Sequence, residues 1–385
     1  MWRNSAGRVI CVQRCDMAVV GGGPAGLASV IKAAELGVER IMLLERDEFL
    51  GGQLVKQTHK FFGARDEYAG MRGIEIAEHF QERIDELSAI EVKKGAVAQG
   101  FYEDDVLGYT HQGRFKKLDP ERLLLATGAS EKMLTFANND LPGVYGAGAV
   151  QTLMNQYGII PGEKVLMIGG GNIGLIVAYQ LLQADVGVAG VVEAESGIGG
   201  YSVHATKIRR CGIPLYTEHT IIRAEGEEEV EGAVIQKLDD DWQPVEGAEK
   251  RLDVDTICLA VGLAPIVDLA IQAGCEMAYI PEFGGDVPWR DEDMRTSHEA
   301  VFVAGDAAGV EEATAAILEG ELAACAMARD LLGEKSEIME EKTRARDKLN
   351  VLREGPVGDE IRSGLERMRR DIDAGEDRYS HQSRA

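Results

Sequence analysis

The feature that most constrains the fold of this 385-residue chain is a glycine-rich unit that occurs twice. The first copy spans residues 17–45 and the second spans residues 164–193. In each copy a short apolar run enters a turn of sequence Gly-Gly-Gly-x-x-Gly, an apolar stretch with helical spacing follows, and a second apolar run ends on a glutamate. This order predicts a strand, a tight turn, a helix and a parallel strand. The chain therefore carries two copies of a nucleotide-binding unit.

The three spaced glycines of the first turn have separate tasks in this prediction. Gly21 permits the tight turn, Gly23 lets the backbone approach a pyrophosphate, and Gly26 lets the helix pack closely on the strand. The pyrophosphate then meets free N–H groups at the positive end of the helix. Glu45 lies 19 residues after Gly26, where an acid accepts hydrogen bonds from an adenosine ribose. The alternative is a tight turn that binds no ligand.

The second turn repeats these offsets with Gly169, Gly171 and Gly174, and Glu193 again follows 19 residues later. A 2′-phosphate a few ångströms from the Glu193 carboxylate would cost about 4 kcal/mol at an effective dielectric constant near 20. No arginine follows until Arg209. We therefore predict NAD(H) rather than NADP(H) as the nucleotide of this copy.

Several further apolar runs end in glycine turns, at residues 123–128, 257–262 and 301–306. Strands that alternate with helices imply parallel sheets, so we predict an α/β fold with two Rossmann-like domains. The formal net charge of −24 argues against binding to nucleic acid or anionic membranes. No apolar run approaches the length that spans a bilayer, and residues 1–15 do not resemble a signal peptide. We expect a cytoplasmic protein.

Together these motifs resemble the two-dinucleotide-fold pyridine nucleotide:flavin oxidoreductases. The thioredoxin-reductase-like branch is similar in size, and the flavoprotein subunits of sarcosine oxidase, opine oxidase and hydrogen cyanide synthase are similar too. The resemblance implies FAD at the first turn and NAD(H) at the second. It further implies a discontinuous FAD-binding domain (16–142 and 264–334), an inserted NAD-binding domain (143–263) and a charged helical tail (335–385).

The resemblance also assigns further residues to the flavin. The loop that contains Gly52 and Gln53 runs beside the FAD, and the turn at Thr127 and Gly128 marks where the chain leaves the FAD domain. Asp306, after Gly305, holds the ribityl or pyrophosphate region. The helix that begins near Ala313 lies under the N1–O2 edge of the flavin. The complete set of predicted cofactor residues is Gly21, Gly23, Gly26, Glu45, Gly52, Gln53, Thr127, Gly128, Gly305, Asp306, Ala313, Gly169, Gly171, Gly174 and Glu193.

Two residues are candidates for catalysis. His59 follows the Gly-Gly-Gln-Leu loop and is a candidate proton donor, because its pKa lies near neutrality; the alternative is a surface or packing histidine. Glu312 is a candidate for proton management or for binding a cationic substrate. The alternative is an acid favoured at a helix N-terminus.

The six cysteines depart from the pattern of the disulfide reductases. None forms a C-x-x-C pair, and no cysteine lies between Cys15 and Cys211. A dithiol relay needs a nucleophilic thiolate and a resolving partner. We therefore predict that the chain does not reduce disulfides, and we predict no metal site.

Three functions remain open from the sequence. The first is an FAD-dependent oxidoreductase that transfers electrons between NAD(H) and a non-disulfide acceptor or partner protein. The second is a flavoprotein subunit of an amine, amino-acid or opine dehydrogenase complex. The third is a scaffold that keeps its flavin only for structure. Two apolar stripes of the tail, headed by Ile338 and Ile361, predict docking on the chain's own body, on a second copy in a homo-oligomer, or on a different protein of a complex.

Overall fold

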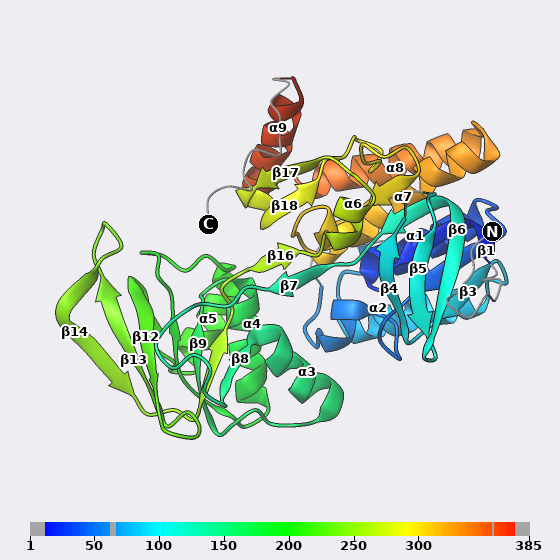
Figure 1. Cartoon of the computed structure of the whole chain (residues 1–385). Coiled ribbons are helices and arrows are strands. Elements are labelled where there is room, and N and C mark those ends of the chain that lie inside the picture. Colours follow the sequence, from blue (N-terminus) through cyan, green and yellow to red (C-terminus); the bar gives the residue numbers. More distant parts are fainter. Residues whose placement is uncertain (1–11, 62–66, 103, 356–357, 374–385) are drawn as a thin grey trace. The chain divides into compact units, whose positions relative to one another are not determined.

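The computed structural model describes residues 12–61, 67–102, 104–355 and 358–373. The chain divides into two compact units (Figure 1): unit 1 comprises residues 1–130 and 264–385, and unit 2 comprises residues 131–263. The segments that connect them include strands β7 (Ala129–Glu131) and β16 (Leu263–Pro265), which pair with each other. The chain first passes from unit 1 to unit 2 after residue 130, whereas the sequence predicts this domain boundary after residue 142. The nucleotide bound by each unit stays a prediction.

Unit 1 is built on a largely parallel sheet. Its elements are β1 (Val12–Val20), α1 (Pro24–Glu35), β2 (Ile41–Leu44), η1 (Gly52–Lys56), α2 (Gly73–Asp85), β3 (Ile90–Lys93), β4 (Ala96–Phe101), β5 (Leu107–His111), β6 (Arg114–Leu125), α6 (Asp268–Gln272), β17 (Met277–Ile280), η3 (Pro281–Phe283), β18 (Gly285–Pro288), β19 (Val301–Val303), η4 (Gly305–Ala307), α7 (Ala313–Leu332), α8 (Ser336–Leu352) and α9 (Asp359–Asp373). The sheet order is β3-β2-β1-β6-β5-β4, with β19 beside the end of β6. Strands β3, β2, β1, β6 and β19 are parallel, whereas β5 is antiparallel to both of its neighbours, β6 and β4.

Helix α7 is the central helix of unit 1 and packs against both α1 and α8 (Figure 1). Its side chains are buried almost without interruption from Thr314 to Ala328. A helix that is covered on more than one side must be apolar nearly all round, and the Ala-rich sequence of α7 meets that requirement. A Cβ added to Gly320 would lie 2.1 Å from the carbonyl oxygen of Ala25, so α7 and α1 approach backbone to backbone.

Unit 2 contains a five-stranded parallel sheet and a three-stranded antiparallel sheet. Its elements are β8 (Val144–Gly146), α3 (Ala147–Tyr157), β9 (Lys164–Ile168), α4 (Asn172–Gln183), β10 (Gly187–Val192), α5 (Ser202–Arg210), β11 (Leu215–Tyr216), β12 (His219–Glu225), β13 (Gly232–Leu238), β14 (Pro244–Leu252) and β15 (Thr256–Leu259). The parallel order is β11-β10-β9-β15-β8, and the antiparallel order is β12-β13-β14.

The residues of β9 alternate between two cores, as successive side chains of a strand must. Val165 and Met167 join a cluster with residues of α3, α4 and α5. Leu166 and Ile168 join a second cluster with residues of β12 and β13. The helices therefore cover one face of the parallel sheet, and the antiparallel sheet covers the other. Both units show the α/β, Rossmann-like organisation predicted from the glycine repeat.

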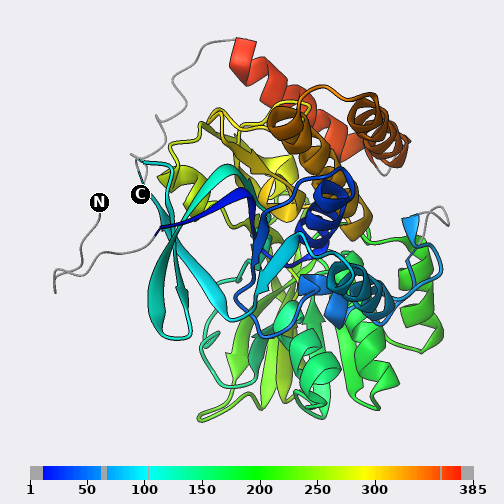
Figure 2. The same ribbon diagram turned by 90° about the vertical axis from the view of Figure 1, so that its right-hand side faces the viewer.

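The two described helices of the tail, α8 and α9, pack on the rest of unit 1. Ile338, Ala345 and Leu349 of α8 belong to the main core of unit 1. Ile361 and Met368 of α9 form a separate cluster with residues of β17, η3 and β18, and Figures 1 and 2 both show α9 beside these strands. Both predicted apolar stripes therefore contact the chain's own body. The last residue of the second stripe, Ile372, has a side chain outside the described set.

Candidate dinucleotide sites

In unit 1 the predicted flavin motifs converge on one edge of the sheet. Val20 of β1 is level with Leu44 of β2 and with Leu125 of β6, and Leu125 is level with Val303 of β19. Because these strands are parallel, the residues that follow them emerge together at their carboxyl ends. The first glycine turn, Glu45, the Thr127–Gly128 turn and the Gly305–Asp306 segment thus share this edge, where ligands bind in open α/β sheets.

In the first turn, the fold requires glycine at positions 21 and 26 but not at position 23. Gly21 has a φ of +110°, and a Cβ there would lie 2.1 Å from the carbonyl oxygen of Ala126. A Cβ on Gly26 would lie 1.9 Å from the carbonyl oxygen of Gly21. In contrast, Gly23 has a φ of −82°, and the nearest atom to its Cβ position is 4.0 Å away. The protein leaves open space over Gly23, where the sequence predicts a pyrophosphate.

The carboxylate of Glu45 is tied to the turn. One oxygen accepts the backbone N–H of Gly22 at 2.6 Å, and the other accepts the N–H of Asp47 at 2.8 Å. Burial raises the pKa of Glu45, and these two N–H groups oppose that rise. Each carboxylate oxygen has a further lone pair, so the group can also accept ribose hydroxyls.

The loop around Gly52 lies directly against the first turn. The N–H of Gly51 donates to the carbonyl oxygen of Gly22 at 2.8 Å, and a Cβ on Gly52 would lie 2.8 Å from the Cα of Gly23. Gln53 is exposed. This loop therefore borders the open space over Gly23.

At the same edge the Thr127 hydroxyl donates to the carbonyl oxygen of Ile266 at 2.7 Å, and the N–H of Ile266 donates to the carbonyl oxygen of Gly128 at 2.9 Å, so the Thr127–Gly128 turn is bonded to the returning chain segment. Asp306 lies in η4 and is partly buried. Burial raises the pKa of Asp306 to about 6, and the carboxylates of Glu319 and Glu311 act in the same direction, while the backbone N–H of Glu311 opposes them.

The two catalytic candidates lie in different surroundings. His59 is half-buried and stacks on Phe61, with ring centroids 6.2 Å apart. Glu312 is exposed at the N-cap position of α7, immediately before Ala313. Its neighbour Glu311 points into an ion-pair network instead, where it contacts Arg353 at 2.6 Å. This geometry does not test whether His59 or Glu312 acts in catalysis, so both roles stay predictions.

Sequence reasoning missed the buried network that supports Gly305. Glu319 of α7 accepts the N–H of Gly305 at 3.0 Å through one oxygen. Its other oxygen accepts Arg290 at 3.0 Å and Arg353, the residue after α8, at 2.6 Å. A glutamate within the apolar run of α7 was the signal that could have indicated it, because a buried carboxylate requires cationic or N–H partners.

Unit 2 repeats the geometry of the first turn. Gly169 has a φ of +107°, and a Cβ on Gly174 would lie 2.0 Å from the carbonyl oxygen of Gly169. In contrast, no atom lies within 4 Å of the Cβ position of Gly171. The Glu193 carboxylate accepts the N–H of Gly170 at 2.7 Å and that of Glu195 at 3.1 Å. The second turn therefore has the same open space over its middle glycine.

The described cysteines do not form a disulfide. Cys15, Cys258, Cys275 and Cys325 are buried, and Cys211 is exposed. Burial raises the pKa values of Cys15 and Cys325 to about 12, which disfavours their thiolates. Cys11 lies outside the described residues.

Two features are absent from the described residues. No helix among them is both long and apolar enough to cross a membrane. No three His, Cys, Asp or Glu side chains within the same residues are grouped to hold a metal ion.

Two Rossmann-like units, each with a glycine turn and an acid bonded to it, define the class of two-dinucleotide-fold flavoprotein oxidoreductases. The chain belongs to the pyridine nucleotide-disulphide oxidoreductase family, whose sequence profile matches residues 15–320. The resemblance inferred from the motifs is thus confirmed.

Three curated relatives are 28–29% identical to this chain over the aligned residues. One of the opine oxidase subunits, from Agrobacterium tumefaciens (strain Ach5), is 29% identical over 82% of this chain and 66% of its own length. The HcnB protein of hydrogen cyanide synthase from Pseudomonas protegens is 28% identical over 87% of this chain and 75% of its own length. The alpha subunit of sarcosine oxidase from Rhizobium meliloti (strain 1021) is 28% identical over 82% of this chain and 31% of its own length. The chain thus spans about two thirds of this opine oxidase relative and about one third of this sarcosine oxidase relative.

Solved structures share the fold at lower sequence identity. Thioredoxin reductase of T. acidophilum matches with a TM-score of 0.68 and 19% identity, over 83% of this chain and 99% of that one. L-proline dehydrogenase of P. horikoshii matches with a TM-score of 0.65 and 22% identity, over 88% of this chain and 60% of that one. At this identity the likeness shows the fold alone.

Proposed function

We propose that this chain is an FAD-dependent oxidoreductase that transfers electrons between NAD(H) and a non-disulfide acceptor or partner protein. The observation that carries the proposal is the open space over Gly23 and Gly171. Neither glycine is required by its φ or by its neighbours. A middle glycine that the protein itself does not need is accounted for by a ligand that approaches the backbone.

The residues of unit 1 fit the proposed flavin cofactor. The N–H groups at the start of α1 and its dipole favour the pyrophosphate over Gly23, while Glu45 offers lone pairs to the ribose. The Gly52 loop borders the same space. The bound flavin would supply two-electron chemistry, and the protein would contribute binding and orientation.

The residues of unit 2 fit a nicotinamide nucleotide in the same way. The start of α4 faces the open space over Gly171, and Glu193 lies at the end of the adjacent strand. Its negative charge disfavours a 2′-phosphate. These features support NAD(H) as the electron carrier.

A second function is supported by the names of the relatives, which are subunits of opine oxidase, sarcosine oxidase and hydrogen cyanide synthase. We also propose, as the alternative, that the chain is the flavoprotein subunit of an amine, amino-acid or opine dehydrogenase complex. In that case the organic substrate, rather than NADH, delivers electrons to the flavin.

Anaerobic titration of the purified yellow protein separates these functions. Loss of the oxidised flavin spectrum on addition of NADH, with no change on addition of sarcosine, proline or an opine, supports the first proposal. Reduction by one of the amines but not by NADH supports the alternative. A flavin that none of these donors reduces would contradict both and would indicate a structural cofactor.

A further inference from the structure

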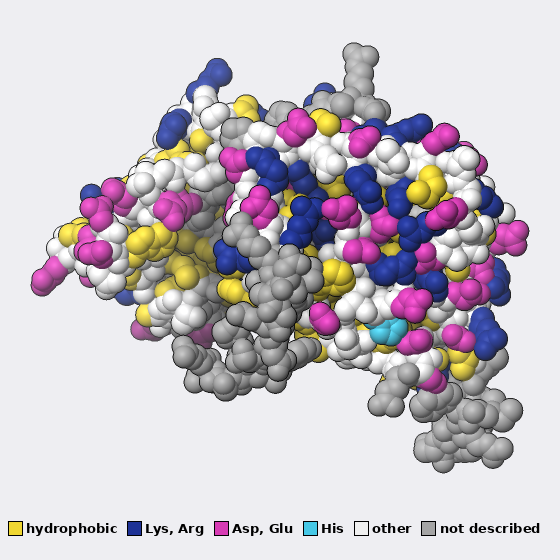
Figure 3. Space-filling model, turned by 90° about the horizontal axis from the view of Figure 1, so that it is seen from above, with side chains coloured by type: hydrophobic (Ala, Val, Ile, Leu, Met, Phe, Trp, Pro, Cys, Tyr) yellow, Lys and Arg dark blue, Asp and Glu magenta, His cyan; other side chains and the backbone are white. Residues whose placement is uncertain are grey.

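Unit 1 contains a cavity of about 350 Å³ between the segment after β18 and helices α7, α8 and α9. We call it the arginine cavity, because four arginines line it: Arg290, Arg346, Arg353 and Arg369. Figure 3 shows Lys and Arg side chains gathered on a face of the molecule, interleaved with Asp and Glu. Apolar contacts in the cavity come from Trp289, Leu349 and Met368.

Three buried donor atoms on the side chains that line the cavity have no hydrogen-bond acceptor among the described residues: Trp289 Nε1, Arg290 Nε and Arg346 Nε. Leaving a buried donor unsatisfied costs about 1–3 kcal/mol, and more for a charged group. The three nitrogen atoms are themselves buried, so a molecule in the cavity reaches them only if these side chains rotate toward it. The cost of leaving the donors unsatisfied favours such a rotation when a molecule that supplies acceptors enters.

The nearby carboxylates are already shared among several cations. Glu319 accepts both Arg290 and Arg353 on the same oxygen. Asp293 accepts Arg329 at 2.9 Å, Lys342 at 3.0 Å and also Arg346.

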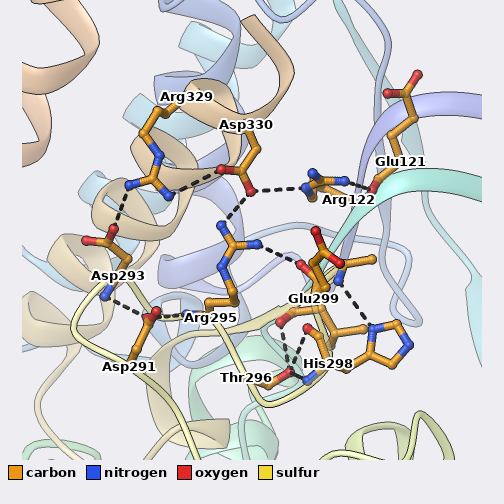
Figure 4. Close-up of polar contacts among 12 residues, drawn as sticks. Glu121, Arg122, Asp291, Asp293, Arg295, Thr296, His298, Glu299, Arg329 and Asp330 are labelled. Carbon is orange, nitrogen blue, oxygen red and sulfur yellow. Dashed lines mark hydrogen bonds and ion pairs between the residues drawn. The ribbon is translucent and has the colours of Figure 1, made fainter. Parts of the chain in front are cut away.

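Figure 4 shows that Arg329 bridges the carboxylates of Asp293 and Asp330. The Asp330 carboxylate also accepts Arg122 at 3.1 Å and Arg295 at 2.5 Å. These described residues form two separate ion-pair clusters. In the first, Arg122, Arg295, Arg329, Lys342 and Arg346 share two carboxylates, those of Asp293 and Asp330. In the second, Arg290 and Arg353 share the carboxylates of Glu311 and Glu319.

The cavity lining itself contains two acids, Asp291 and Glu292, beside the four arginines. One oxygen of Asp291 accepts the backbone N–H groups of Asp293 and Arg295 at 2.8 and 2.9 Å. Glu292 is paired at 2.8 Å with Arg369, which also lines the cavity. A locally cationic cavity in a chain with a formal net charge of −24 is a specific feature rather than a reflection of composition.

We propose that the arginine cavity binds a small organic oxyanion, whose carboxylate or phosphoryl oxygens accept the N–H groups of Trp289, Arg290 and Arg346. An oxyanion offers several lone pairs and a negative charge, and both are what the cavity lacks. The volume leaves room for an organic part against Trp289 and Leu349. None of the residues that line the cavity belongs to either glycine turn, so the proposal does not depend on the identity of the nucleotides.

The test is isothermal titration of the purified full-length protein with succinate and, separately, with glycerol 3-phosphate, at constant ionic strength. Binding of either probe supports the site, and the better probe distinguishes carboxylate from phosphoryl recognition. Trp289→Phe retains the aromatic ring but removes one donor, and Arg346→Gln removes another donor from a side chain that is 35% exposed. Each substitution should weaken binding about tenfold, the expected loss for one hydrogen bond to a charged group.

The matched control is Arg344→Gln on the same helix. Arg344 has a side chain that is 64% exposed, is paired with Glu341, and does not line the cavity. The control should change affinity less than about twofold, as expected for an exposed ion pair. The proposal is overturned if neither probe binds the wild type, or if binding is weakened equally by Arg344→Gln and Arg346→Gln. If one cavity variant does not fold, as judged by circular dichroism, the other decides the question.

Discussion

Glu45 accepts the backbone N–H of Gly22 at 2.6 Å, and this contact ties the acid at the end of β2 to the glycine turn after β1. Glu193 makes the same contact with Gly170 at 2.7 Å in unit 2. Two segments far apart in the sequence thus build the same local structure. In both, the acid shapes the turn and retains lone pairs for a ligand.

The first turn offers a matched pair of single-methyl substitutions. Gly26→Ala should destabilise the protein by more than about 4 kcal/mol or prevent folding, because its Cβ would lie 1.9 Å from the carbonyl oxygen of Gly21. Gly23→Ala should change the free energy of unfolding by no more than about 1 kcal/mol, because its Cβ enters open space. Only Gly23→Ala should give folded protein with little flavin. Urea unfolding and the visible spectrum check both outcomes, and a Gly23→Ala protein with full flavin content would count against the FAD site.

Glu193 should set the preference for NADH over NADPH. Glu193→Gln retains a carbonyl oxygen for the N–H of Gly170 but removes the charge that repels a 2′-phosphate. We expect the ratio of the NADPH to the NADH rate constants for flavin reduction to rise at least about tenfold. Stopped-flow measurements at matched concentrations check this. An unchanged ratio would show that Glu193 does not face the adenosine ribose.

Arg353 should contribute strongly to the free energy of unfolding, although it lies beyond the end of α8. Its side chain is 8% exposed and contacts Glu311 and Glu319. Burial alone would lower the pKa of Arg353, but these two carboxylates raise it above its ordinary value. Arg353→Met should cost about 3–5 kcal/mol, because it leaves buried carboxylates with less compensation. Arg344→Met, at an exposed position, should stay within about 0.5 kcal/mol.

The cost of Arg353→Met should depend on pH. Burial raises the pKa of Glu311 even though Arg353 opposes the rise, so loss of Arg353 raises it further. A folded-state pKa above the unfolded value means that the folded protein takes up a proton as the pH falls through it. The deficit relative to wild type should therefore shrink between about pH 7.5 and pH 5. Urea unfolding at the two pH values measures it, and a deficit that grows toward acid would contradict this account.

Disulfide reduction should be absent. Within the described residues, four of five cysteines are buried and none is paired. NADH-driven reduction of DTNB through added thioredoxin should be negligible. A slow background should be the same in a variant with all six cysteines changed to alanine. Robust turnover that requires the cysteines would show that a dithiol forms, for example through Cys11, which lies outside the described residues.

The two glycine turns could be predicted from the sequence, but the ion-pair contacts between distant residues could not. The glycine offsets and the acids at 45 and 193 predict the strand–turn–helix geometry, because each depends on neighbouring backbone. The contacts of Glu319 with Arg290 and Arg353 join three segments, and no spacing rule links them. The stripes of α8 and α9 predicted burial, but the choice of the chain's own body as partner depends on complementary apolar surfaces elsewhere in unit 1.

The central claim is that NADH bound at the second glycine turn reduces FAD bound at the first. Single-turnover reduction under anaerobic conditions tests it most directly, with the wild type compared with Gly171→Val. The wild type should carry one FAD per chain and lose its oxidised flavin spectrum with one equivalent of NADH. Gly171→Val should retain its FAD but be reduced far more slowly, because the side chain fills the space over the turn. Equal reduction rates in the two proteins, or no reduction of the wild type by NADH, would contradict the claim.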